Sequence, residues 1–130
     1  MQLELLGAVR TVFDKNYVVW NPSWEILYIH VLDQTVGATR FRMHRDVEED
    51  SNQYGKGHRL RVMHTVVLLL DKGTGKKVPG LYVAGADKHA TYPKEMVGHV
   101  FNASLYHTTE IVKDGDSSGV KVGVFIGYRF

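Results

Sequence analysis

Alternation of apolar and polar residues with a period of two dominates this chain and predicts a fold made mainly of β-strands. The clearest example is residues 59–71, in which a basic beginning leads into the wholly apolar run from Val66 to Leu70. A continuous apolar run bounded by turn residues is typical of a strand that is covered on both faces. We therefore expect this segment at the centre of the core, with its charged beginning at the rim of a sheet.

Seven other segments show a similar pattern and are expected to form strands. They are residues 2–13, 17–20, 24–33, 39–47, 81–86, 100–112 and 120–130. The last of these is expected either to pack on the core as an amphipathic strand or to form an edge that is open to another subunit. Only residues 92–99, with Pro93 near their start, predict a short helix.

This set of elements predicts an all-β fold: an antiparallel β-sandwich or barrel of about eight strands with at most one short helix. The connections are too short and too rich in glycine to supply the crossover helices that a parallel α/β sheet needs. The chain has 130 residues, no fixed-period repeat and no linker, so we expect a single β domain over residues 1–130.

Composition narrows the function only slightly. The net charge of +2 is too small to indicate nucleic-acid binding, and the absence of cysteine excludes disulfides, thiolate zinc sites and cysteine nucleophiles. No secretion signal and no apolar stretch of membrane-spanning length is visible. We therefore expect no membrane partner, and a cytoplasmic or virion location in preference to secretion.

Basic residues gather in one expected hairpin, formed by residues 39–47 and 58–65 around the loop 48–57. Arginine side chains on one sheet face match phosphate, sulfate or carboxylate groups. The alternative is a solvated face with cross-strand ion pairs to the neighbouring acids. The candidate anion- or partner-binding residues are Arg40, Arg42, Arg59 and Arg61.

Seven histidines are many for this length, but no two of them have the i, i+2 spacing of a chelating pair on a strand. HExxH and nucleophile motifs are also absent, so no catalytic residue is predicted. His30 and His64 lie in apolar strands and are expected to be buried, hydrogen-bonded core residues. A metal site assembled from distant strands remains an alternative.

Three short motifs have a familiar order. Trp24-Glu25 precedes an apolar strand, His44 follows, and a Leu-Tyr-Val-Ala strand leads to the sequence His-Ala-Thr-Tyr-Pro at residues 89–93. This order resembles the necrosis-inducing and Vps62-like β-sandwich proteins. The resemblance implies a divalent cation held near Glu25, His44 and His89. The acids and the histidine that precede the Trp-Glu pair in the toxin branch are absent here.

The functional hypothesis favoured by these patterns is a non-enzymatic binding or assembly module without a cofactor. It would be a homo-oligomeric subunit, or a decorating or connecting structural protein, of a larger cellular or viral assembly, with the basic hairpin facing an anionic protein partner. The alternative hypothesis is a cation-dependent hydrolase or membrane-active β-sandwich that uses Glu25, His44 and His89.

Overall fold

The computed structural model describes residues 2–34, 43–46, 48–49, 60–75, 77–84, 88–110 and 117–130. Within these residues the chain forms one α-helix, α1 (Gln2–Lys15), and eight strands. The strands are β1 (Glu25–Asp33), β2 (Glu48–Glu49), β3 (Leu60–Asp71), β4 (Leu81–Val83), β5 (Lys88–Ala90), β6 (Gly98–Asn102), β7 (His107–Thr109) and β8 (Val120–Arg129).

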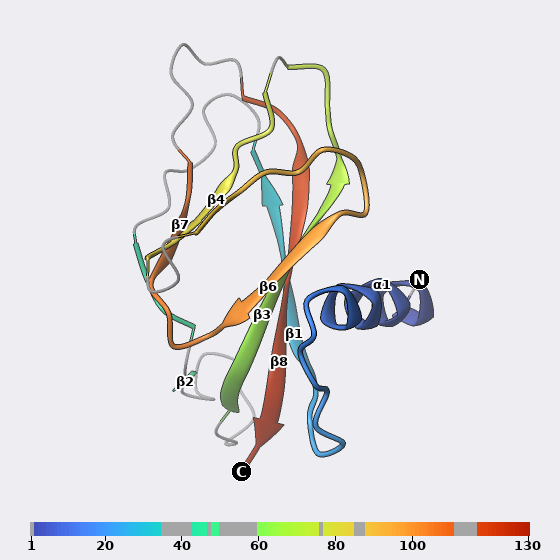
Figure 1. Ribbon diagram of the computed structural model, residues 1–130, viewed down its shortest axis with the longest axis vertical. Coiled ribbons are helices and arrows are strands. Elements are labelled where there is room, and N and C mark those ends of the chain that lie inside the picture. Colours follow the sequence, from blue (N-terminus) through green and yellow to red (C-terminus); the bar gives the residue numbers. More distant parts are fainter. Residues whose placement is uncertain are drawn as a thin grey trace.

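These elements form three layers (Figure 1). The middle layer is a five-stranded antiparallel sheet with the order β1-β8-β3-β2, in which β6 also pairs with β3. Helix α1 packs on one face of this larger sheet, and a three-stranded sheet with the order β5-β4-β7 lies on the other. The predicted all-β fold with one short helix is confirmed.

The strand order is that of a jelly roll. His44 forms an antiparallel bridge with His107, so residues 43–46 lie beside β7 and extend the smaller sheet. The order β1-β8-β3-β6 then faces the order 43–46, β7, β4, β5. Two antiparallel sheets connected in this way leave a space between them that side chains from both sheets line.

Strand β3 lies at the centre and is buried on both faces, as its apolar run predicts. Val66 and Leu68 belong to the core cluster that α1 covers. Val67 and Leu69 point to the other side, where they pack against the smaller sheet. Strand β8 also lies inside the larger sheet, between β1 and β3, so the alternative that the last strand is an open edge is wrong.

The expected strand at residues 2–13 is wrong, because these residues belong to helix α1. Leu5, Val9, Val12 and Phe13 follow one another at helical spacing, and all four pack in the core cluster beside the larger sheet. The Leu-Glu-Leu beginning imitates the period of a strand, but the later spacing of four, three and one residues marks one face of a helix.

Helix α1 ends at a tight turn, and the strand predicted at residues 17–20 is therefore absent. The N–H of Val18 donates to the carbonyl of Phe13 at 3.0 Å, and the N–H of Tyr17 donates to that of Asp14 at 3.2 Å. These are the two hydrogen bonds of a Schellman ending. Tyr17 has a φ of 56°, a conformation that usually selects glycine.

Two further local predictions need correction. Residues 92–97 are irregular or turn, and strand β6 begins at Gly98, so no helix forms over 92–99. Residues 43–46 pair with the smaller sheet and not with β3 as the hairpin prediction required; β2 provides the pairing with the beginning of β3 instead. Most of the predicted basic hairpin lies outside the described residues.

Candidate metal centre

Three side chains of types that can bind a metal ion converge at the edge of the smaller sheet. His44, Asp46 and His107 each place one ligand atom within 4.8 Å of the other two. His44 Nε2 lies 3.4 Å from Asp46 Oδ1, and His107 Nε2 lies 3.0 Å from Asp46 Oδ2. Ligand atoms about 2.1 Å from one ion are about 3 Å apart when they bind at right angles. The spacing therefore fits one face of a divalent-ion coordination sphere.

Backbone pairing explains why these side chains meet. The N–H of His44 donates to the carbonyl of His107 at 3.0 Å, and the N–H of His107 donates back at 2.9 Å. Residues that exchange both bonds in an antiparallel pair project their side chains on the same face. Asp46 is two residues further along the strand and shares that face. Its N–H is held by the carbonyl of Ala103 at 2.9 Å.

The contacts of His107 are compatible with a metal ion at its Nε2. Nδ1 of His107 lies 3.1 Å from the carbonyl oxygen of Leu105, and Nε2 lies 3.0 Å from the Asp46 carboxylate. Both partners can only accept, whereas a neutral imidazole has a single N–H. If Nδ1 of His107 donates to the carbonyl of Leu105, the Nε2 lone pair of the neutral ring is available to a metal ion. The bond to a backbone carbonyl is the usual way of orienting a metal-bound histidine.

Asp46 is held as a buried carboxylate, with 7% of its surface exposed. Burial acts to raise its pKa. Hydrogen bonds from His107 and His44, the charge of His107 and a hydrogen bond from Thr65 lower the pKa by more than burial raises it. The net effect holds the pKa of Asp46 well below its usual range. The hydroxyl of Thr65, on β3, donates to Asp46 Oδ2 at 2.9 Å and ties the cluster to the larger sheet.

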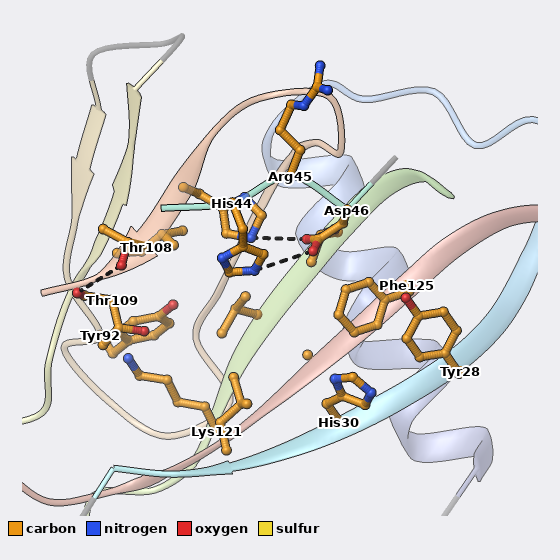
Figure 2. Close-up of a pocket in the computed structure, with 16 residues that line it drawn as sticks. Tyr28, His30, His44, Arg45, Asp46, Tyr92, Thr108, Thr109, Lys121 and Phe125 are labelled. Carbon is orange, nitrogen blue, oxygen red and sulfur yellow. Dashed lines mark hydrogen bonds and ion pairs between the residues drawn. The ribbon is translucent and has the colours of Figure 1, made fainter. Parts of the chain in front are cut away.

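The cluster opens into a cavity of about 210 Å³ between the two sheets (Figure 2). Strands β1, β3 and β8 of the larger sheet form one wall, and β4, β7 and residues 44–46 form the other. Asp46 is the one acidic residue among the described residues that line the cavity. The remaining lining is aromatic at one end and contains a buried lysine with a tyrosine at the other.

Lys121 is the buried lysine, with only 1% of its surface exposed. Its ammonium group donates to the carbonyl of Pro79 and, at 3.3 Å, to the side-chain oxygen of Gln34, and it lies 4.4 Å from the centre of the Tyr92 ring. Burial lowers the pKa of Lys121 to about 8, although the charge of Glu110 acts to raise it. A cation in this position favours an anionic ligand in the cavity.

Tyr92 supplies a second polar group beside Lys121. Its side chain is 5% exposed, and its hydroxyl has no hydrogen-bond partner among the described residues. Burial raises the pKa of this hydroxyl, so it stays protonated and can donate. A buried donor without a partner is costly, so a ligand in the cavity that accepts a hydrogen bond from this hydroxyl would be stabilised.

The three metal-site residues predicted from the sequence are not all part of this cluster. His44 belongs to the cluster, but Glu25 forms an ion pair with Arg129 at 3.1 Å, and His89 packs against the Tyr82 ring at 4.5 Å. The structure brings His44 together with Asp46 and His107 instead of with Glu25 and His89.

The four candidate arginines remain largely unplaced. Arg40, Arg42 and Arg59 lie outside the described residues. Arg61 lies in β3, where it pairs with Glu48 on one side and with Tyr128 on the other. The predicted anion-binding face therefore stays a prediction.

The prediction that His30 and His64 are buried, hydrogen-bonded core residues is wrong. His30 is exposed on β1 and contacts the Phe125 ring at 5.2 Å. His64 is partly buried between Phe13 and Trp24, but its buried Nδ1 has no hydrogen-bond partner among the described residues. Strand β1 lies at the edge of the larger sheet, which explains the exposure of His30.

One sequence signal for the cluster was available. His44-Arg45-Asp46 is a His-x-Asp motif, in which the i, i+2 spacing puts two ligands on one face of a strand. A search restricted to pairs of histidines does not detect it. No pattern in the sequence pairs this motif with His107, because that neighbour depends on the strand order.

Comparisons with known protein families and with curated proteins find no match to this chain. The resemblance to the necrosis-inducing and Vps62-like proteins stays a prediction. Among the described residues, no helix combines the length and the apolar character that crossing a bilayer requires.

Proposed function

We propose that this protein is a non-haem iron(II) oxygenase that uses a 2-oxo acid as its co-substrate. The observation that carries the proposal is the convergence of His44, Asp46 and His107 on the wall of a cavity between the sheets. Two imidazoles and one carboxylate on one face of an ion, with the other positions open, are the ligand set of mononuclear iron(II) oxygenases.

The three ligands found among the described residues support a catalytic centre in preference to a structural one. Structural zinc sites are closed by four protein ligands, whereas three ligands leave positions for substrates. An octahedral ion bound by His44, Asp46 and His107 would keep three positions free for dioxygen and for a chelating co-substrate. When bound, the iron supplies the one-electron chemistry that activates dioxygen, which no protein side chain provides.

Reduction of dioxygen requires four electrons, and hydroxylation of a C–H bond supplies only two. Oxidative decarboxylation of a 2-oxo acid supplies the other two, according to R–H + O₂ + R′COCO₂⁻ → R–OH + R′CO₂⁻ + CO₂. The atoms and the charge balance in this equation. A 2-oxo acid also binds a metal through two oxygens, which suits an ion that has adjacent open positions.

Lys121 and Tyr92 support a co-substrate with a second carboxylate. The buried ammonium group of Lys121 is hydrogen-bonded to two neutral oxygens, and the Tyr92 hydroxyl has no acceptor among the described residues. A carboxylate at this end of the cavity would accept from both groups and neutralise the cation. We therefore expect a dicarboxylic 2-oxo acid, such as 2-oxoglutarate.

The chain's other contacts position these groups. Thr65 donates to the Asp46 carboxylate, and the carbonyl of Leu105 lies beside Nδ1 of His107 and orients its ring. Thr65 lies on β3, His107 on β7 and Lys121 on β8, so strands on both sides of the cavity position these groups. Such support is what an enzyme needs to keep ligands in place during turnover.

The test uses the full chain reconstituted with iron(II) under anaerobic conditions. Adding 2-oxoglutarate and dioxygen should release CO₂ and consume dioxygen, slowly when no second substrate is present. His107→Ala and Asp46→Ala should abolish this turnover. His89→Ala, outside the cavity lining, is the matched control and should retain it. Tight zinc binding with ester or peptide hydrolysis, and no iron-dependent CO₂ release, would contradict the proposal and favour a hydrolase.

The sequence predicts a non-enzymatic assembly module, and the proposed oxygenase departs from the non-enzymatic part of that prediction. The assembly role stays a prediction. Strand β1 is at the edge of the larger sheet, and its Ile29 and Val31 side chains are exposed. Light scattering at tens of micromolar tests it: an oligomer would support the prediction, and a strict monomer would count against it.

A further inference from the structure

The end of the cavity away from Lys121 has a different character. Tyr28 and Phe125 stack with their ring centres 4.4 Å apart and their planes inclined by 15°. His30 meets Phe125 edge-on, with ring centres 5.2 Å apart and planes inclined by 67°. All three side chains line the cavity. Figure 2 shows Phe125 between Tyr28 and the part of the cavity near Asp46.

We infer that this aromatic wall, together with Gly123, forms a subsite for a planar aromatic ring of the substrate that is to be oxidised. The inference rests on the proposed function, because the ring would be presented to the ion held by His44, Asp46 and His107. It names the substrate class: small, uncharged aromatic compounds, or larger compounds that present one such ring.

Gly123 supplies the floor of the subsite. It lines the cavity from β8, between Lys121 and Phe125 on the same face of the strand. A Cβ atom placed there would lie 3.4 and 3.6 Å from two ring carbons of Phe125 and 3.9 Å from the carbonyl of His30. These are ordinary contacts, so neither the backbone nor a neighbour requires glycine. The missing side chain leaves space in the cavity beside Phe125.

Gly127 of the same strand shows the contrast. A Cβ atom there would overlap the carbonyl oxygen of Arg61, so glycine is required by close approach of β3. Of these two glycines, Gly123 lines the cavity. The two glycines look equivalent in the sequence, but they have different reasons to be there.

The size and polarity of the subsite select a single neutral ring. A cavity of about 150 Å³ lined by apolar side chains is enough to bind benzene in another protein. The cavity here is about 210 Å³, which accommodates one ring with part of a co-substrate. The Tyr28–Phe125 wall carries no formal charge, while Lys121 lies at the other end. An aromatic ring can stack on such a wall, and an aliphatic ring of the same size cannot.

The experiment measures the binding of phenol and of cyclohexanol, a saturated ring of nearly the same size, to the purified full chain without added metal. Titrations followed by NMR at the amides of Gly123 and Phe125 give the dissociation constants. Stacking should make phenol bind about two- to tenfold more tightly than cyclohexanol. Phe125→Leu should remove this preference.

Gly123→Leu should fill the floor and weaken binding of both rings by at least about tenfold, since the leucine side chain occupies the ring's volume. Tyr128→Leu is the matched control on the exposed end of β8, and it should leave both affinities unchanged. Circular dichroism checks that each variant is folded. If Gly123→Leu fails to fold, Phe125→Leu alone decides the outcome.

Equal affinity for the two rings in the native protein would overturn the inference, as would full phenol binding by folded Gly123→Leu. Iron binding is measured separately. Ring binding without iron binding contradicts the proposed oxygenase and leaves the subsite standing. Iron-dependent turnover without a ring preference contradicts the subsite alone.

Discussion

His44 and His107 exchange both backbone hydrogen bonds of one antiparallel pair, and their imidazole centres lie 4.2 Å apart. This pairing fixes the separation of two candidate metal ligands through the backbone. Asp46 joins them because of its position in the same strand and because Thr65 donates to it. The site is therefore a property of strand register as much as of its three side chains.

Loss of the Thr65 hydroxyl should weaken metal binding without removing a ligand. In Thr65→Val the carboxylate of Asp46 loses its fixed orientation, and iron(II) affinity is expected to fall by about tenfold. Anaerobic titration monitored by calorimetry measures the change. Thr11→Val, which removes a surface hydroxyl on α1, is the control and should bind iron like the native protein. An unchanged affinity in Thr65→Val would show that Asp46 needs no such support.

Binding of 2-oxoglutarate should depend on the protonation of Lys121. Its pKa of about 8 means that the ammonium form predominates below pH 8 and is lost as the pH rises above it. Affinity should therefore be constant from pH 6.5 to 7.5 and should fall by up to about tenfold per pH unit well above 8. Lys121→Arg should retain binding at pH 9, because guanidinium remains charged. A pH-independent affinity up to pH 9.5 would exclude Lys121 as the carboxylate partner.

Glu110 allows an independent test of the role of Lys121. Its negative charge raises the pKa of Lys121, in opposition to burial. Glu110→Gln should therefore make the decline in 2-oxoglutarate affinity begin at a lower pH. The same titration series, with isothermal calorimetry at each pH, measures the displacement. A shift towards higher pH would mean that another group controls the binding.

His64 should make the folded state sensitive to acid. Burial lowers its pKa below 6.5, so the folded protein disfavours the charged ring that the unfolded chain accepts. The stability associated with neutral His64 is fully present above pH 6.5 and is lost as the pH falls towards the folded-state pKa. Urea unfolding at pH 7.5 and pH 5.0 should show a smaller loss for His64→Leu than for the native chain. An equal loss would assign the acid sensitivity to other residues.

Replacing Tyr17 by glycine should increase the free energy of unfolding, which most surface substitutions do not. It is 94% exposed and adopts a left-handed conformation at the end of α1. Tyr17→Gly removes about 1 kcal/mol of backbone strain, partly offset by the entropy of glycine in the unfolded chain. We expect the free energy of unfolding to rise by about 0.5 kcal/mol, measured by urea titration. Tyr17→Ala keeps the Cβ atom and should bring no gain.

The strands could be predicted from sequence because burial of one strand face produces an alternation of apolar and polar residues with a period of two. The strands predicted at residues 59–71 and 120–130 correspond to the adjacent β3 (Leu60–Asp71) and β8 (Val120–Arg129). Helix α1 was missed because its first residues alternate, and its helical spacing emerges only over Leu5 to Phe13. A short segment can fit both the period of a strand and that of a helix, and packing against the rest of the chain decides which of the two forms.

The candidate site was harder to predict from the sequence, for a different reason. His44 was singled out, and Asp46 is its near neighbour, but His107 becomes a partner only through the strand order of a jelly roll. Lys121 lies on the face of β8 opposite Val122 and Val124, which pack in the core cluster that α1 covers. The sequence does not reveal that a second sheet covers this face and buries the ammonium group.

The pairing of His44 with His107 has a consequence for folding as well. An ion bound there would close the long chain segment between positions 46 and 107, much as a cross-link does in proteins that contain cystine. This chain has no cysteine to serve that purpose. Metal loading should then slow unfolding and protect the smaller sheet from proteases, and chelators should reverse both effects. Cellular iron supply would in that case set how long the protein survives, and not only how fast it works.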